Sequence, residues 1–179
     1  MRTPVFVGRG VVGACIMALP WCNAGAGQTR TVCSWLALGG GLSSLGFTAA
    51  SAALSVQVDH LLVSARLTGN NSQLFGGEAY EDYGLLVGYG WRAKPVRMGL
   101  AGGVGMVHGW EFQGPWLDLF GHGQGTWVDK GTALGFPLEI QAFIPICRFF
   151  GVGTYYFCNI NPFRSFSGAT VTLVFGKLW

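Results

Sequence analysis

The chain has 179 residues, of which 11% are charged, 50% are hydrophobic and 30 are glycine. This length corresponds to one domain, and so little charge is unusual for an ordinary water-soluble domain. The formal net charge of +3 falls to +1 without Arg2 and Arg9, and no basic patch alternates with aromatic residues, so nucleic acid is not an expected partner.

The N-terminus has the pattern of a secretory signal peptide. Arg2 and Arg9 precede the apolar run Val11 to Leu19, and small residues follow up to Ala26. A retained membrane anchor is the alternative, but Pro20 interrupts the run, which is shorter than the roughly 20 apolar residues of a spanning helix. We therefore expect a signal peptide over residues 1–26, and a single domain over residues 27–179.

The predicted mature chain keeps three widely spaced cysteines, Cys33, Cys147 and Cys158. No CxxC pair or Cys/His spacing typical of a metal site occurs, so neither a metal nor a cofactor is expected. Export permits a disulfide between Cys33 and Cys147, which fall at the same end of the barrel predicted below. We favour the alternative that the cysteines are small apolar core residues.

Residues 31–58 carry no charge and form the strongest helical candidate in the sequence. The segment contains Gly39, Gly40 and Gly41 and several serines, which are poor residues for a helix that faces lipid. Alternation of apolar with small or polar residues recurs along the whole chain instead. This favours strands over a single transmembrane helix.

Eight segments show this alternation, taken in chain order. In the seventh, aromatic residues occupy both faces, so its register stays open. The segments cover about 36–42, 54–58, 61–68, 81–91, 98–106, 134–144, 149–160 and 166–179.

The fourth segment shows the clearest pattern. Tyr83, Leu85, Val87, Tyr89 and Trp91 share one face, and glycine dominates the other. A tall apolar stripe opposite glycine suits a sheet whose outer solvent is lipid. Tyr83 and Trp91 are eight residues apart, a height of roughly 20 Å for a tilted strand, so their rings are predicted to lie in the two interfacial aromatic belts.

The connections between the segments alternate in length. Those around 58–60, 92–96 and 145–147 are short, whereas 69–81 and 109–131 are long; the first, about 43–48, is shorter than the series requires. An even number of strands with alternately short and long connections is typical of bacterial outer-membrane barrels. On these features the chain resembles the small eight-stranded barrels, such as the OmpA transmembrane domain and OmpX.

The resemblance implies an all-β fold, an eight-stranded antiparallel up-and-down transmembrane β-barrel. It further implies a monomer with a filled, non-conducting lumen in the outer membrane of a Gram-negative-type bacterium. The expected partners are outer-membrane lipid, lipopolysaccharide and, during insertion, the barrel-assembly machinery.

Two charged residues, Arg66 and Glu139, fall on inward positions within strands. In hydrocarbon each would cost about 2–4 kcal/mol at mid-depth, so both are expected to point into the lumen. The resemblance favours a direct Arg66–Glu139 ion pair, because charge networks fill such barrels; the alternative is that each finds water or another polar group.

The remaining charges are sorted by end of the predicted barrel. Acids concentrate at the external end, where only Lys130 and Arg164 offset them, and bases concentrate at the periplasmic end. The acids are Glu78, Glu81, Asp82, Glu111, Asp118 and Asp129, and the bases are Arg92, Lys94, Arg97, Arg148 and Lys177.

The chain ends on Trp179, preceded by Val171, Leu173 and Phe175 at alternate positions. This end resembles the signal read by the barrel-assembly machinery, although Lys177 stands where an apolar residue is usual. The alternative is an ordinary edge strand.

Candidate chemistry gathers around the connection 109–131. It brings His108 near Glu111, Asp118, His122 and Asp129, but no spacing is diagnostic of a metal or catalytic site. Lipid A deacylases of this architecture use a His-x-Ser arrangement that the chain lacks, so an enzyme is not expected.

The aromatic residues of the same connection, Trp110, Trp116 and Trp127 among them, form a predicted loop surface. They either bind a ligand or, as we favour, rest on the barrel mouth or in the lipopolysaccharide interface. The expected role is structural or surface interaction through the long external loops. The alternatives are a lipid-modifying hydrolase using His108 or His122, and a soluble lipocalin-like ligand carrier.

Overall fold

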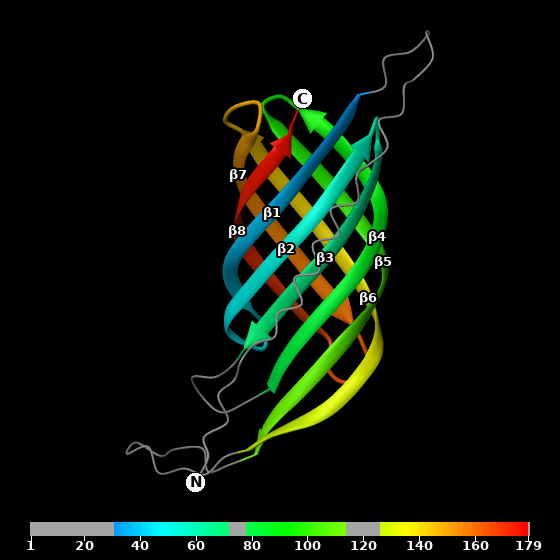
Figure 1. Ribbon diagram of the computed structural model, residues 1–179, viewed down its shortest axis with the longest axis vertical. Coiled ribbons are helices and arrows are strands. Elements are labelled where there is room, and N and C mark those ends of the chain that lie inside the picture. The colour runs from blue at the N-terminus through cyan, green and yellow to red at the C-terminus, as the bar shows by residue number, and fades with distance from the viewer. Residues whose placement is uncertain (1–30, 72–77, 114–125, 179) are drawn as a thin grey trace.

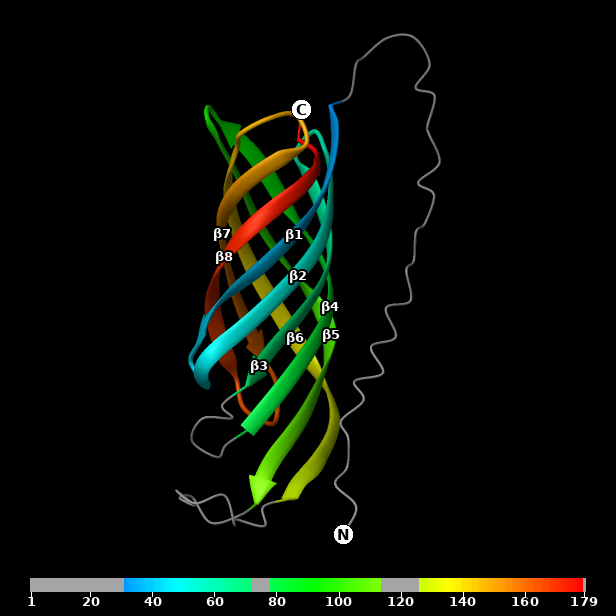
Figure 2. The same ribbon diagram turned by 60° about the vertical axis from the view of Figure 1, so that its left-hand side comes forward.

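A computed structural model describes residues 31–71, 78–113 and 126–178. Eight antiparallel strands close into one barrel, in which each strand pairs with its neighbours in the sequence and the last pairs with the first (Figures 1 and 2). The predicted all-β, eight-stranded fold is confirmed; the predicted signal peptide lies outside the described residues. The strands are β1 (Val32–Ser43), β2 (Gly46–Val58), β3 (Leu61–Asn71), β4 (Glu78–Ala93), β5 (Val96–Gln113), β6 (Thr126–Pro145), β7 (Phe150–Ile160) and β8 (Phe166–Lys177).

The segment that could have been one helix forms the hairpin β1–β2, with Leu36 opposite Leu54. Within the described residues, no helix has the length and apolar character needed to cross a membrane. The β1–β2 turn, and the connections β3–β4, β5–β6 and β7–β8, lie at what we call the long-connection end. The turns β2–β3, β4–β5 and β6–β7 lie at the short-turn end, which also holds the C-terminus (Figure 1).

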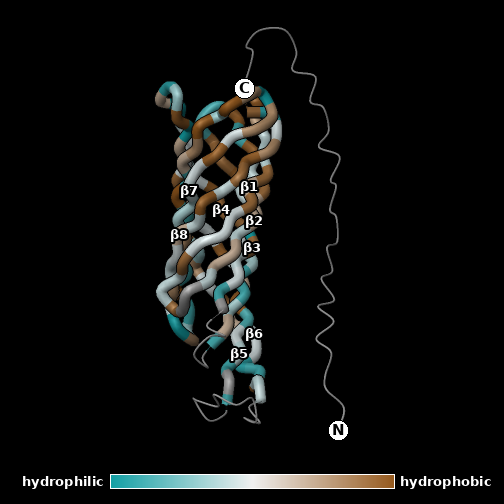
Figure 3. Tube along the Cα trace, turned by 90° about the vertical axis from the view of Figure 1, so that its left-hand side faces the viewer, coloured by the Kyte–Doolittle hydropathy of each residue, from teal (hydrophilic) through white to brown (hydrophobic). Residues whose placement is uncertain are grey.

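The outer wall of the barrel is apolar. Leu85 is 67% exposed and Val171 66%, whereas Leu86, the next residue after Leu85, is fully buried. Figure 3 shows hydrophobic residues gathered over much of the barrel wall and hydrophilic residues on the projecting ends of β5 and β6. This is the reverse of a soluble carrier, which keeps its apolar side chains inside.

Side chains fill the inside of the barrel. Trp35, Phe143 and Phe157 each have at most 4% of their surface exposed, and the rings of Trp35 and Phe143 lie 5.3 Å apart. The open register of the seventh strand is resolved: Tyr155 and Phe157 point inward, and Tyr156 is 47% exposed. The lumen is therefore more aromatic than the small and polar residues of the other strands had indicated.

Glycines on the inner face occupy places where a side chain does not fit. A Cβ on Gly88 would lie 1.9 Å from the carbonyl oxygen of Leu100, and one on Gly103 would lie 1.9 Å from that of Leu85. On Gly90 it would meet the Gln57 side chain at 2.7 Å. The inner face of β4, opposite its apolar outer face, is rich in glycine because the narrow interior has no room for larger side chains.

Replacing Gly103 with Ala is expected to lower the free energy of unfolding by about 1–3 kcal/mol, because the methyl group meets backbone that cannot move aside cheaply. Urea unfolding of protein refolded in detergent micelles measures this. Gly69→Ala is the control, since a Cβ there meets nothing within 4 Å. Equal losses for the two variants would contradict the steric explanation.

Both ends of the connection 109–131 are strand, which corrects the long loop predicted there; residues 114–125 lie outside the described residues. β5 continues to Gln113, β6 begins at Thr126, and the pairing shifts between Gly109 and Trp110 at a bulge. β6 pairs with β7 only from Phe136 onward, so its first part projects beyond the barrel together with the end of β5 (Figure 2). We call this projection, residues 126–135 of β6 with the end of β5 that pairs with them, the β5–β6 extension.

Candidate functional site

An ion pair is sealed inside the barrel. Arg66 on β3 and Asp82 on β4 have fully buried side chains, and Nε of Arg66 donates to Oδ2 of Asp82 at 3.1 Å, with a second hydrogen bond from Nη2 to the same oxygen. The guanidinium also donates to the carbonyl oxygens of Leu138, at 2.8 Å, and Cys158, at 3.1 Å. Arg66 thus ties β3 to β4, β6 and β7 across the lumen.

The predicted Arg66–Glu139 ion pair is wrong, although both residues point inward as expected. Glu139 instead accepts a hydrogen bond from the Tyr155 hydroxyl and one from Gln141 Nε2 at 2.7 Å. Asp82 is predicted from the sequence at the external end of the barrel, because it lies close to the predicted connection 69–81. It has the same inward alternation as Gly84 and Leu86, and that signal identifies it as a lumen residue.

Polar contacts continue from Glu139 toward the short-turn end. Gln141 accepts a hydrogen bond from the Trp35 indole at 3.1 Å and donates to Ser55 at 3.3 Å, and Ser55 bonds Ser64 at 3.1 Å. Gln141 and Ser64 each stand two residues from a predicted inward charge, Glu139 and Arg66, and so share its face, but their partners depend on the strands that face each other across the lumen.

A second charge cluster lies at the long-connection end. Glu78 on β4 pairs with Lys130 on β6 and, at 3.0 Å, with Arg164 in the β7–β8 connection; Glu111 is 3.5 Å from Lys130. Burial alone would raise the pKa of Glu78, but hydrogen bonds from Lys130 and Arg164 outweigh it and hold that pKa below 4.5. The cluster links the β5–β6 extension to the barrel.

Replacing Glu78 with Gln is expected to lower the free energy of unfolding at neutral pH by about 1 kcal/mol, as befits a partly exposed ion network. The contribution of Glu78 is fully present above its unfolded pKa of 4.5 and is lost as the pH falls through the lower folded value. The difference between wild type and E78Q should therefore shrink below pH 4.5, as urea unfolding across pH measures. Glu111→Gln, at a 46% exposed side chain, should have a smaller effect; a difference that grows in acid would contradict the assignment.

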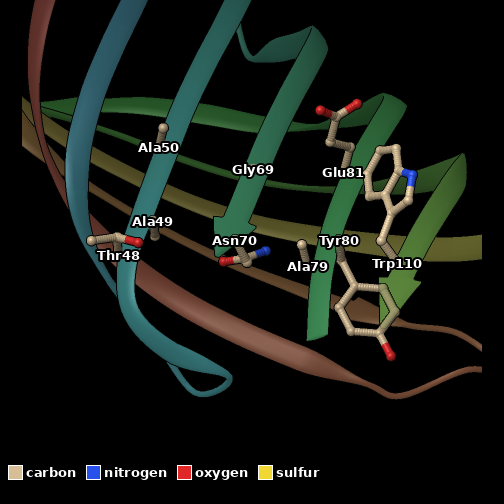
Figure 4. Close-up of a pocket in the computed structure, with 9 residues that line it drawn as sticks. All are labelled: Thr48, Ala49, Ala50, Gly69, Asn70, Ala79, Tyr80, Glu81 and Trp110. Atoms are coloured by element: carbon tan, nitrogen blue, oxygen red, sulfur yellow. The ribbon is translucent and has the colours of Figure 1, made fainter. Parts of the chain in front are cut away.

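A groove of about 300 Å³ crosses β2 to β5 near the long-connection end (Figure 4). The small residues Ala50, Gly69 and Ala79 line it together with Glu81 and Trp110. Ala50 pairs with Gly69, which pairs with Glu81, and these positions alternate with the buried Asn70 and Tyr80, so the groove opens on the outer wall.

Two of the predicted loop tryptophans, Trp110 and Trp127, stand on the paired strands β5 and β6. Trp110 stands on β5 and lines the groove, with its ring 4.2 Å from that of His108. Trp127 stands on β6 and is partly buried, and Trp116 lies outside the described residues. Trp110 and Trp127 therefore belong to strands of the extension, not to a loop.

His108 has polar neighbours on two sides. Its Nδ1 lies 2.9 Å from Thr132 Oγ1, and its Nε2 lies 3.2 Å from Asp129 Oδ1. The Asp129 side chain is 63% exposed, so water competes for its contact with the ring. His122 and Asp118 lie outside the described residues.

The remaining predicted site residues keep their places on the outer wall. Tyr83 is 47% exposed, and Trp91 lies on the same face of β4, with its ring 6.1 Å from that of Tyr89. Val171, Leu173 and Phe175 point outward, and Trp179 lies outside the described residues. Their roles as aromatic belt and assembly signal stay predictions.

The three cysteines of the described chain are free thiols, with Cys33 buried and Cys147 exposed. The disulfide between these two that export would permit is not formed.

The closed ring, the apolar outer wall and the ion pair inside it define a small eight-stranded membrane-spanning β-barrel. Among solved structures, Neisserial surface protein A is similar over 84% of this chain and 100% of its own, at 12% identity and a TM-score of 0.56. The N-terminal β-barrel domain of Pseudomonas aeruginosa OprF is 8% identical over 83% of this chain and 99% of its own, at a TM-score of 0.49.

The attachment invasion locus protein Ail of Yersinia pestis is 11% identical over 83% of this chain and 97% of its own, at a TM-score of 0.46. No protein-family model and no curated protein matches the sequence. The likeness to Neisserial surface protein A supports the fold and leaves the function to the site itself.

Proposed function

We propose that the chain is an outer-membrane protein of a Gram-negative-type bacterium that serves as a surface-interaction module. The observation that carries this proposal is the β5–β6 extension, a polar hairpin that projects beyond an apolar barrel wall and is tied to it by Glu78, Lys130 and Arg164. A projecting hairpin on a rigid barrel offers a partner a fixed surface. The long-connection end then faces outward and the short-turn end faces the periplasm.

The barrel itself acts as a monomeric, non-conducting support. Its lumen holds the Arg66–Asp82 ion pair and several buried aromatic rings. Moving ions through it would require separating those charges and displacing those rings, both of which cost free energy. Lipid and lipopolysaccharide surround the wall, and the assembly machinery inserts the chain.

The test combines heat-modifiable gel migration with proteolysis of intact cells. Protein refolded in detergent should run faster unboiled than boiled, because a closed barrel resists the detergent. Protease added to intact cells should cut the connection between β5 and β6, near Gln113 and Thr126. Cutting only after the cells are broken open would reverse the orientation, and recovery in the periplasmic fraction without detergent would overturn the membrane location.

A lipid-modifying hydrolase is the second candidate, favoured by one observation. Thr132, His108 and Asp129 form a chain of hydroxyl, imidazole and carboxylate on the outer surface, the order of a nucleophile, a base and a group that orients it. The exposed Asp129 makes this the weaker proposal. Purified protein incubated with lipopolysaccharide, followed by mass spectrometry of lipid A, separates the two: an acyl-chain change abolished by His108→Ala would replace the structural role with an enzymatic one.

A further inference from the structure

Arg97 is a buried arginine at the short-turn end of the barrel. Arg97, the second residue of β5, is 4% exposed. Its Nη2 donates to the Cys33 sulfur at 3.1 Å and its Nη1 to Gln57 Oε1 at 3.4 Å, while its buried Nε has no hydrogen-bond partner. Among the described residues, no carboxylate forms an ion pair with Arg97.

The immediate neighbour of Arg97 adds positive charge. Arg92 on β4 lies directly opposite Arg97 in the β4–β5 pairing, and like charges in that relation repel each other. A buried cation whose contacts are a thiol and an amide oxygen is poorly compensated, because burying a charge costs free energy unless an opposite charge lies nearby. A negative charge beside Arg97 would therefore be stabilising.

There is room for that charge. A cavity of about 270 Å³ lies at this end of the barrel. A water molecule takes up about 30 Å³ of liquid, so the cavity accommodates a small oxyanion with several waters. Its lining includes Cys33, Gln57, Asp59, Arg92 and Arg97.

We propose that this cavity is a binding site for a small oxyanion, a carboxylate or a phosphate, held by the guanidinium of Arg97. Besides the N–H groups given to Gln57 and Cys33, Nη1 and Nη2 each have a second N–H, and together these form the planar end of the guanidinium that binds two oxygens of such a group side by side. Arg92 and Asp59 also line the cavity, and their opposite charges favour a small ligand of low charge. The site is independent of the surface role of the β5–β6 extension.

Titration calorimetry on the full barrel, refolded in neutral detergent at constant ionic strength, tests this. Inorganic phosphate and acetate are titrated separately, so that the two arms distinguish phosphate-bearing from carboxylate-bearing ligands. We expect saturable one-to-one binding of at least one of them, weakened tenfold or more by Arg97→Gln. Arg148→Gln is the matched control, since Arg148 is exposed at the same end and lies over the Phe149 ring. Absence of saturable binding, or an equal loss in R148Q, overturns the proposal.

R97Q could also bind the anion weakly because the substitution disturbs the fold. Unfolding in urea distinguishes this from the loss of a direct contact. In chloride buffer R97Q should be at least as stable as wild type, because it lacks the uncompensated charge. The binding anion should raise the urea midpoint of wild type and R148Q but not that of R97Q. A large loss of stability in R97Q that is the same in both buffers would show that Arg97 is compensated within the protein, and would overturn the proposal.

The Cys33 thiol, ionised, is the competing source of negative charge. Cys33→Ser removes that possibility and keeps a small polar group beside Arg97. We expect C33S to bind the anion within a few-fold of wild type. Binding that is absent in wild type and present in C33S would assign the counter-charge to the thiolate and overturn the oxyanion site.

Discussion

Replacing Arg66 with Met is expected to lower the free energy of unfolding by about 3–5 kcal/mol, because it leaves the carboxylate of Asp82 buried without a cation. It also removes the donors to the carbonyl oxygens of Leu138 and Cys158. Urea unfolding of the refolded barrel, followed by tryptophan fluorescence and by unboiled gel migration, measures the loss.

The double variant Arg66→Met with Asp82→Asn should regain a large part of that loss, since the uncompensated charge is gone. Glu139→Gln is the matched comparison, because Glu139 accepts hydrogen bonds from Tyr155 and Gln141. Its effect should add to that of Arg66→Met without offsetting it. If E139Q restores stability and D82N does not, the ion pair has been assigned to the wrong carboxylate.

Replacing Val87 with Arg is expected to lower the free energy of unfolding from lipid vesicles by about 2–4 kcal/mol, the cost of a cation near the middle of the hydrocarbon. Val87 lies midway between Tyr83 and Trp91 on the outward face of β4 and is 59% exposed. Equilibrium unfolding from vesicles in urea measures the difference. A barrel whose outer wall faced water would lose nothing, because an exposed Val makes few contacts.

Val128→Arg is the comparison for this prediction. Val128 is 38% exposed and stands on the β5–β6 extension, beyond the last β6–β7 pair at Phe136. Outside the hydrocarbon the same cation should cost less than about 1 kcal/mol. Similar losses at Val87 and Val128 would mean that the apolar band is not the part of the wall that lipid covers.

The candidate site was only partly visible in the sequence. Trp110 was recognised as an exposed aromatic residue, but its place beside Ala50, Gly69 and Ala79 follows from the pairing of β2 through β5. Arg97 was recognised as a base near the short turns, whereas its burial beside Cys33 follows from the closure of the barrel. Residues distant in sequence meet there only once the ring is closed.

The sequence by itself determined the strands and their faces. Alternation along one strand is a property of the local backbone, since successive side chains point to opposite faces whatever the neighbours are. It correctly assigned Leu85 outward and Arg66 and Glu139 inward. Glycine on the inner face likewise indicated a narrow interior.

Only the tertiary structure decided which inward groups meet. The partner of Arg66 depends on the stagger of β3 against β4 and on the curvature of the closed sheet, and these set Asp82, not Glu139, against its guanidinium. The length of β5 and β6 was undecided for a different reason. Beyond the membrane no lipid enforces the apolar alternation, and the extension depends on pairing between the two strands and on the contacts of Glu78 with Lys130 and Arg164.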